Sequence, residues 1–318
     1  MDILKKIFIL VLFLFPLGEL VRIDLDNNII VKPLDIGLGL MVFLWLIFKL
    51  KKRESLKQKN ILIPILFFTS AAILSLLMNY SSLSYDQFLT SFLYLVRWVI
   101  YACTIFIISD FDRNFKKRMS SLLVVVGSLV VGLGYLQYFF YPSLKNLFYL
   151  GWDEHMYRMF SVFLDPNFAG AFFVLFFLFL TSLFIKQKNI LIGLLLILTL
   201  VAIFLTFSRS ALIMLIVSSS LLFILMSRKI WITLLLGITF LALAISSKYF
   251  DVENINLFRV VSTQARLETT ENAIRVIQNH PFFGVGFNAY RYTQLRYGFR
   301  NDKAEVISHA DSGIDNSI

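Results

Sequence analysis

The sequence predicts an all-α membrane protein, a polytopic bundle of about nine spanning helices with a large outer segment. Two observations predict this fold class. Of 318 residues, 58% are hydrophobic and 16% are charged, whereas soluble domains carry about 25% charged residues. The hydrophobic residues gather in long runs, and lysine and arginine gather in the short loops between the runs, as membrane orientation requires.

The candidate spans approach the length of about 20 residues that a spanning helix needs. The first run is short and follows Lys5 and Lys6, which also fits the apolar core of a signal peptide. No small-residue cleavage site follows it, so we predict a retained helix. The expected spans are Ile7–Leu20, Leu34–Leu50, Ile61–Met78, Phe88–Ser109, Ser120–Tyr141, Phe168–Ile185, Ile190–Phe207, Ala211–Met226 and Ile230–Ser246.

The loops that follow the even-numbered spans are the cationic ones. With the N-terminus, they hold Lys5, Lys6, Lys49, Lys51, Lys52, Arg53, Lys57, Lys59, Arg113, Lys116, Lys117, Arg118, Lys186, Lys188, Arg228 and Lys229. The opposite short loops hold far fewer cations. The positive-inside rule therefore predicts a cytoplasmic N-terminus and alternation through all the spans.

Two domains follow from this topology. Residues 1–247 form the transmembrane bundle, and residues 248–318 form an extracytoplasmic segment that is incomplete at its C-terminal end. Within that segment, Asn272–Asn279 is predicted to be helical, Pro281 to end the helix, and Gly284 and Gly286 to shape a turn. No apolar run follows, so we expect a C-terminally truncated chain.

The net charge of +10 does not indicate nucleic-acid binding, because the cations serve orientation. The expected partners include membrane lipids and no nucleic acid. Cys103 is the only cysteine, so an internal disulfide is impossible. No HExxH, HxxxH or DxD pairing suggests a metal site.

Arg97 lies near the middle of its predicted helix, where an isolated arginine costs at least about 2.5 kcal/mol. It must face the bundle interior, a water-filled cavity or an anion. One interpretation is a ligand-binding role. The alternative is an internal ion pair, or a side chain that snorkels to the outer surface.

Two further arginines stand at predicted outer turns. Arg158 opens the phrase RMFSVFLDPNFAG, in which Asp165 and Pro166 are suited to begin a helix. Arg209 lies in LTFSRSALI, where hydroxyls and the start of the next helix favour an anion such as phosphate. The alternative for Arg209 is a turn residue that caps the carbonyls of the preceding helix.

The outer segment adds Arg266, in RLETTENAIRVIQNHPFFGVGFNAY. Arg266 and Arg275 are nine residues apart, which is roughly 180° around a helix. Both cannot point into one site on a continuous helix, and we favour Arg266. His280 precedes Pro281 and is interpreted as structural.

Three phrases together resemble the O-antigen ligase and polymerase family of bacterial membrane glycosyltransferases. They are RMFSVFLDPNFAG, LTFSRSALI, and the arginine-to-HPFFGVGFNAY stretch from Arg266. Their order and spacing agree with the predicted topology. The resemblance covers roughly residues 60 to 310.

The resemblance implies a GT-C-like bundle that moves glycan from an undecaprenyl-pyrophosphate carrier to a glycan or lipid-linked acceptor. It implies a place in the bacterial cytoplasmic (inner) membrane, with an active extracytoplasmic face, and no metal or nucleotide-sugar cofactor. The expected pyrophosphate ligands are Arg97, Arg158, Arg209 and Arg266. The last three match the family by motif, whereas Arg97 is included because it lies in the outer half of the predicted bundle. His309 and Arg266 are the expected catalytic residues, with His309 as the base for the acceptor hydroxyl.

Two features depart from the family pattern. In the family the histidine is commonly followed by Asn or Ser and then by an apolar helix, whereas here the sequence from His309 reads HADSGIDNSI with no apolar helix after it. The family's two or three further spanning helices are also not found. Polymerase and ligase share these motifs and stay undecided. The alternative functions are a transporter or flippase for the same lipid-linked glycan, and an inactive truncated remnant. A transporter favours polar residues near the midplane, whereas here only Arg97 lies deep.

Overall fold

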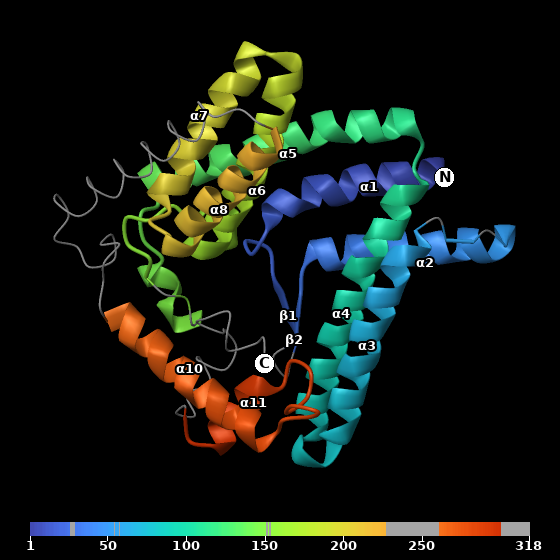
Figure 1. The fold of residues 1–318 in the computed structure, drawn as a ribbon, viewed down its shortest axis with the longest axis vertical. Helices are drawn as coiled ribbons and strands as arrows, with labels where there is room; N and C mark the ends of the chain where they lie inside the picture. The colour runs from blue at the N-terminus through green and yellow to red at the C-terminus, as the bar shows by residue number, and fades with distance from the viewer. Residues whose placement is uncertain are drawn as a thin grey trace. The chain divides into compact units, whose positions relative to one another are not determined.

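The computed structural model describes residues 1–25, 29–53, 55–56, 58–150, 152, 154–226 and 261–299, and these are predominantly helical (Figure 1). The chain divides into two compact units. The first holds Met1–Phe15, Val21–Ser120 and, among the described residues, 261–299. The second holds Pro16–Leu20 and, among the described residues, 121–226.

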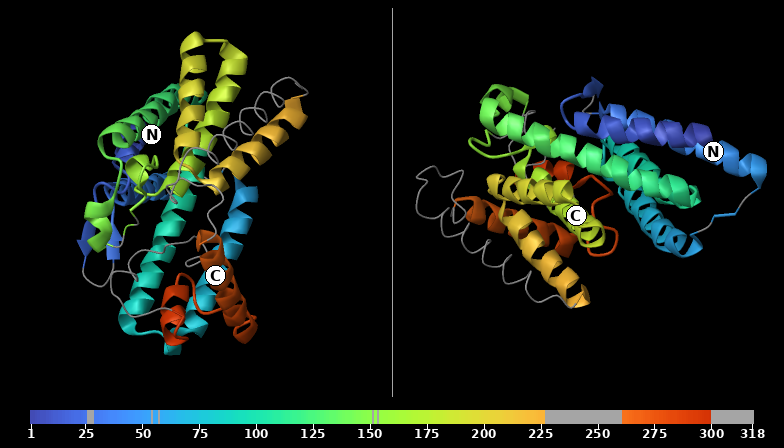
Figure 2. Two further views of the ribbon diagram at one scale, coloured as in Figure 1. Left: turned by 90° about the vertical axis from the view of Figure 1, so that its left-hand side faces the viewer. Right: turned by 90° about the horizontal axis from the view of Figure 1, so that it is seen from above.

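The first unit contains two long helices that lie side by side, joined by a short 3-10 turn, in both Figure 1 and Figure 2. Its elements are α1 (Asp2–Leu14), β1 (Ile23–Leu25), β2 (Ile29–Val31), α2 (Pro33–Lys52), α3 (Lys59–Met78), η2 (Tyr80–Ser82), α4 (Tyr85–Asp110), α10 (Val261–Asn279) and α11 (Tyr290–Arg296). The adjacent pair is α3 and α4. Helix α5 (Arg113–Phe140) begins in this unit and continues into the second.

Local sequence explains where these helices begin. Ser84 precedes α4 and forms a capping box with Gln87. The Ser84 hydroxyl accepts from the backbone N–H of Gln87, and the Gln87 side-chain oxygen accepts from the backbone N–H of Ser84. Pro33 opens α2, and Asp35 accepts from the backbone N–H of Lys32. Both arrangements satisfy amides that the first helical turn leaves without partners.

A β-hairpin between α1 and α2 departs from the all-α expectation. Strands β1 and β2 pair antiparallel, with Ile23 opposite Val31 and Leu25 opposite Ile29. The sequence IDLDNNIIV places β-branched residues on both sides of an Asp-Asn-Asn stretch, which favours a hairpin. Strands this short are not found by looking for long apolar runs. The hairpin nevertheless positions the backbone carbonyl of Ile30, which accepts a hydrogen bond from Arg97.

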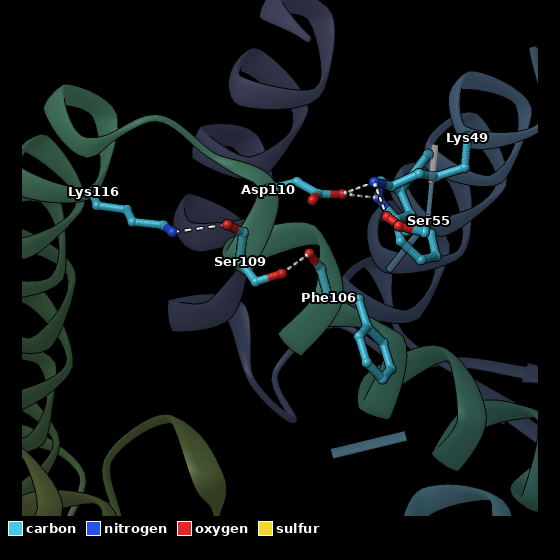
Figure 3. Close-up of polar contacts among 7 residues, drawn as sticks. Lys49, Ser55, Phe106, Ser109, Asp110 and Lys116 are labelled. Atoms are coloured by element: carbon cyan, nitrogen blue, oxygen red, sulfur yellow. Dashed lines mark hydrogen bonds and ion pairs between the residues drawn. The ribbon is translucent and has the colours of Figure 1, made fainter. Parts of the chain in front are cut away.

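A polar cluster joins α2 to the C-terminal end of α4 (Figure 3). Asp110 is 7% exposed and lies 2.9 Å from the ammonium of Lys49. The indole of Trp45 donates to the same carboxylate oxygen, and Lys49 also donates to the carbonyl of Ser55. Lys49 belongs to a predicted cytoplasmic loop, so this ion pair connects two helix ends that the topology puts on the same side.

The second unit is formed by the rest of α5 and by apolar helices that pack closely. They are α6 (Pro166–Gln187), α7 (Ile190–Leu205) and α8 (Arg209–Met226), preceded by η3 (Lys145–Leu150) and η4 (Ser161–Phe163). Helices α6 and α7 form an antiparallel pair, which Figure 2 shows side by side. The predicted start of α6 is confirmed: Pro166 is its first residue, and Asp165 caps it by accepting from the amides of Asn167 and Phe168.

Among the described residues, five helices are long and apolar enough to cross a membrane: α2, α3, α4, α5 and α6. The chain is thus a multi-pass, predominantly α-helical membrane protein. Helices α7 and α8 are apolar but shorter. Helix α1 begins at Asp2 rather than Ile7 and ends at Leu14, and about 20 Å of helix is shorter than a bilayer core. The expected span Ile230–Ser246 lies outside the described residues, so the number nine stays a prediction.

Candidate functional site

The predicted site residues fall into different parts of the chain. Arg158 and Arg209 belong to the second unit, and Arg97 belongs to the first. Arg266 lies in α10, but its side chain is outside the described residues, as is the whole of His309. The structure places Arg158 and Arg209 at the same turn, and pyrophosphate binding by all four arginines stays a prediction.

Arg158 caps the C-terminal end of α7. Its side chain is buried, and its Nε donates to the carbonyl of Thr206 at 2.9 Å while Nη2 donates to the carbonyl of Phe207 at 3.3 Å. The backbone N–H of Met159 donates to the carbonyl of Leu205. A guanidinium here donates to carbonyls that the helix end leaves without partners. Its positive charge is also stabilised by the negative end of the helix dipole. Arg158 thus caps the helix end for which the sequence suggested Arg209 as a capping residue.

The turn that Arg158 holds is lined by buried hydroxyls. Thr206 and Ser208 are fully buried. The Ser208 hydroxyl accepts from the amide of Ala211, as an N-cap does, and donates to the side-chain oxygen of Asn167 at 2.8 Å. Ser210 lies 2.9 Å from the same hydroxyl. This network fixes the first turn of α8 against the first turn of α6.

Gly170 permits this close approach. A Cβ atom at position 170 would lie 2.5 Å from the Cβ of Ala211 and 3.2 Å from the Thr206 hydroxyl. Only a residue without a side chain fits between the two helix starts. Arg209, the first residue of α8, is half-buried at this junction. A guanidinium at a helix N-terminus is suited to phosphate oxygens.

Arg97 lies near the middle of α4 and forms an ion pair. Its Nη2 lies 2.8 Å from Asp35 Oδ2 and also donates to the carbonyl of Ile30, which the hairpin positions. The Tyr101 hydroxyl donates to the other oxygen of Asp35 at 2.9 Å. The expectation of a partner anion or interior position is confirmed, and the anion is Asp35. A role in pyrophosphate binding stays a prediction.

A pocket of about 150 Å³ lies beside this ion pair. Its wall includes Tyr94, Arg97 and Asp35 together with Thr90 and the hairpin strand β2. The Arg97 guanidinium is 4.9 Å from the centre of the Tyr94 ring, which is a cation–π distance. The pocket is therefore lined by an aromatic ring and a balanced ion pair rather than by excess positive charge.

Arg291 is a buried cation that sequence reasoning missed. It is 7% exposed, and its guanidinium lies 5.4 Å from the centre of the same Tyr94 ring and 5.7 Å from that of Tyr292. Its Nε makes no hydrogen bond within the described part of the chain. The sequence signal for such a contact is the position of Arg291 between two tyrosines, in YRY. Helix α11 is too short to show periodicity, so the sequence did not predict that this arginine is buried.

The segment between α10 and α11 follows the sequence expectations. Helix α10 is continuous through Arg266 and Arg275, which is the condition under which the two cannot share a site. Gly284 and Gly286 have φ values of +61° and +103°, which suit glycine. His280 lies 3.3 Å from the Tyr297 hydroxyl, in agreement with a structural role.

This segment packs on the ends of α3 and α4. Ser75 donates to the carbonyl of Phe283, and Asn79 donates to that of Gly284. Arg296 donates to the carbonyl of Ser82 in the α3–α4 connection. The topology puts the end of α3 and the segment after residue 247 on the same side, and these contacts agree with that expectation.

No group of three or more His, Cys, Asp or Glu side chains that could hold a metal ion occurs among the described residues. In a comparison with protein families, residues 194–314 match the model of the O-Antigen ligase family. No curated protein and no solved structure matches the chain. The matched stretch contains Arg209, Arg266 and His309, whereas Arg97 and Arg158 precede it. The match over residues 194–314 confirms the predicted resemblance to the O-antigen ligase and polymerase family.

Proposed function

We propose that this protein is a membrane glycosyltransferase that polymerises or ligates surface polysaccharide. Its donor is a glycan linked to undecaprenyl pyrophosphate, and transfer takes place at the outer face of the cytoplasmic membrane. The O-Antigen ligase match supports the class of enzyme. The charge distribution of the loops supports the orientation.

One observation carries the proposal: Arg209 opens α8 at the turn that Arg158 holds. This turn lies within the matched stretch, and the network of Ser208 and Asn167 fixes the two helix starts beneath it. A half-buried guanidinium at a helix N-terminus offers planar, charged donors for the oxygens of a diphosphate. We assign Arg209 as the principal pyrophosphate contact and Arg158 as the residue that positions its turn.

The transfer step is a substitution at the anomeric carbon of the donor sugar. The acceptor hydroxyl oxygen forms a bond to that carbon, and the bond between the carbon and the pyrophosphate oxygen breaks. Undecaprenyl pyrophosphate leaves with the electron pair, stabilised by Arg209 and Arg266. The hydroxyl proton passes to His309, because an imidazole is the side chain most often used as a general base.

The test is glycan transfer by the purified protein in lipid nanodiscs. Undecaprenyl-pyrophosphate-linked repeat units are supplied, and products are separated by length. Arg209→Ala should lower the rate by about 100-fold, as the loss of a donor to developing charge does. Arg209→Lys should retain part of the activity, because an ammonium supplies charge without the planar pair of donors.

Arg113→Ala is the matched control, since it removes an exposed arginine from the first turn of α5, outside the proposed site. If the Arg209→Ala variant and the Arg266→Ala variant both gave unchanged products, these arginines would not be the pyrophosphate contacts. Movement of the lipid-linked glycan across the bilayer without any new glycosidic bond would instead identify a transporter. Lipid-linked repeat units as acceptors identify a polymerase, and a lipid A-core acceptor identifies a ligase.

A further inference from the structure

The segment from α10 to the following loop presents an apolar surface to its surroundings. Leu267, Ile274 and Ile277 are 60%, 48% and 48% exposed. Their spacings of seven and three residues put them along one stripe of the helix. The stripe continues into Phe282 and Phe283, which are 91% and 49% exposed. We call these five residues the α10 apolar surface.

The other side of α10 is already occupied. Ala273 and Val276 are buried and pack with Val285 and Tyr290 in a small core of their own. The α10 apolar surface is therefore not the packing side of the helix. The charged residues Glu268, Glu271 and Arg275 are exposed on a different part of its circumference. An amphipathic helix of this kind needs an apolar medium on one side and water on the other.

The hydrogen bonds of the loop fix its level relative to a membrane span. Ser75 and Asn79, which bond the carbonyls of Phe283 and Gly284, lie in the last turn of α3 and directly after it. Helix α3 is one of the candidate spans. The end of a spanning helix lies at the bilayer interface, so the loop that bonds to it lies there as well.

The surface of α3 at this end is itself apolar and exposed. Leu74, Leu77 and Met78 are 53%, 57% and 60% exposed. On a spanning helix, such side chains face lipid. The loop that carries Phe282 and Phe283 is thus bonded to a helix end whose exposed side chains are apolar. The two loop carbonyls are already satisfied by α3, which removes much of the cost of placing this backbone near hydrocarbon.

We propose that the α10 apolar surface docks onto the lipid leaflet at the Met78 end of α3. In this arrangement, α10 lies in the plane of the interface, and Phe282 is the residue that enters the leaflet most deeply. Aromatic side chains at the interface anchor a segment at a fixed depth. The surface would hold the start of α10, which carries Arg266, close to the plane where a lipid-linked substrate has its headgroup. The occupant is lipid, and the proposal does not depend on glycosyl transfer.

The test measures contact with lipid directly. In a Cys103→Ser background, single cysteines replace Phe282, Ile274 or Glu268, and each carries an environment-sensitive fluorophore. The protein is placed in nanodiscs that contain lipids spin-labelled near the headgroup or near the chain end. The labels at positions 282 and 274 should be quenched several-fold more strongly by the shallow spin label than the label at position 268. Position 268 is the matched control, because it is an exposed polar site on the same helix.

Three results would overturn the proposal. Equal weak quenching at all three positions, with access to aqueous iodide, would show that the surface faces water. Energy transfer between copies without quenching by lipid would show that a second copy covers it. Protection from both lipid and iodide would show that another part of the same chain covers it. No glycan is present in these measurements, so their failure would leave the proposed transfer reaction unaffected.

Discussion

The turn at residues 206–210 is held by one buried arginine, whereas Tyr94 is in contact with two arginines, one buried and one partly exposed, and the two regions balance these charges in different ways. In the second unit, Arg158 donates to the carbonyls of Thr206 and Phe207 at a helix end. In the first unit, Arg97 is paired with Asp35, whereas Arg291 is in contact with the rings of Tyr94 and Tyr292. An arginine in an apolar chain is therefore informative only together with its partners. A carboxylate partner marks an ion pair, and carbonyl partners mark a helix cap.

The largest stability effect is expected at the ion pair. Asp35→Asn removes the negative charge while keeping an oxygen acceptor for the amide of Lys32. It should lower the free energy of unfolding by about 2–3 kcal/mol, because Arg97 is then left without its counter-charge in a mostly apolar setting. This is below the cost in a fully buried pair, since the Arg97 side chain is 26% exposed. Denaturant unfolding in mild detergent measures the change.

Arg97→Leu in the Asp35→Asn background is the matched rescue. Removing the second charge should recover much of the lost stability, since no charge is then left without a partner. If Asp35→Asn alone left the unfolding transition unchanged, the pair would contribute only what a surface ion pair does.

The next effect is expected at the helix cap. Arg158→Ala leaves the carbonyls of Thr206 and Phe207 without their donors and should lower the free energy of unfolding by about 2 kcal/mol. Arg158→Lys should recover part of this loss, since an ammonium lacks the planar pair of donors. Arg209→Ala should lower stability less than Arg158→Ala does, because the Arg209 side chain is half-buried whereas that of Arg158 is buried, and it should lower transfer activity. Equal loss of stability in the two alanine variants would contradict the division into a positioning and a binding arginine.

A smaller effect is expected at Arg291, whose contacts are with aromatic rings. Arg291→Leu exchanges a cation–π contact for apolar packing and should change the free energy of unfolding by no more than about 1 kcal/mol in either direction. The same unfolding measurement checks it. A loss as large as that of Asp35→Asn would show that Arg291 has a charged partner outside the described residues.

The smallest effect concerns an exposed pair at the start of α5. Hydrogen bonding to Lys5 lowers the pKa of Asp112 below its usual value of 3.8, and hydrogen bonding to Asp112 raises the pKa of Lys5 above 10.5. A carboxyl with a lowered pKa contributes stability above pH 3.8 that is lost as the pH falls through its folded pKa. The contribution of Lys5 is lost only when the pH rises through its own raised pKa.

Asp112→Asn tests this pair, because it keeps an acceptor for the amide of Phe115. The melting temperature of the variant should lie slightly below that of the parent protein at pH 7. The difference should shrink as the pH falls below 3.8. A difference that stays constant down to pH 2 would assign the effect to the helix cap and not to the ion pair.

Much of the fold and part of the site could be predicted from sequence, because the signals are local. The start of α6 follows from Asp165 and Pro166, and the turn after α10 follows from Gly284 and Gly286. Each of these depends on backbone preferences within a few residues. The hydroxyl-rich character of the Arg209 turn was also predicted, since its hydroxyls are neighbours in the chain.

What the sequence alone determined was the membrane class, the helical segments and the polar positions that needed an explanation. The tertiary structure decided the partner of each arginine: Arg158 reaches Thr206, which is 48 residues away in the chain, and Arg97 reaches Ile30, which is 67 residues away. It also decided that Arg291 is buried against Tyr94. The physical reason is that apolar runs and helix caps depend on neighbouring residues, whereas a buried charge is balanced by whichever oxygen or ring the packing brings to it.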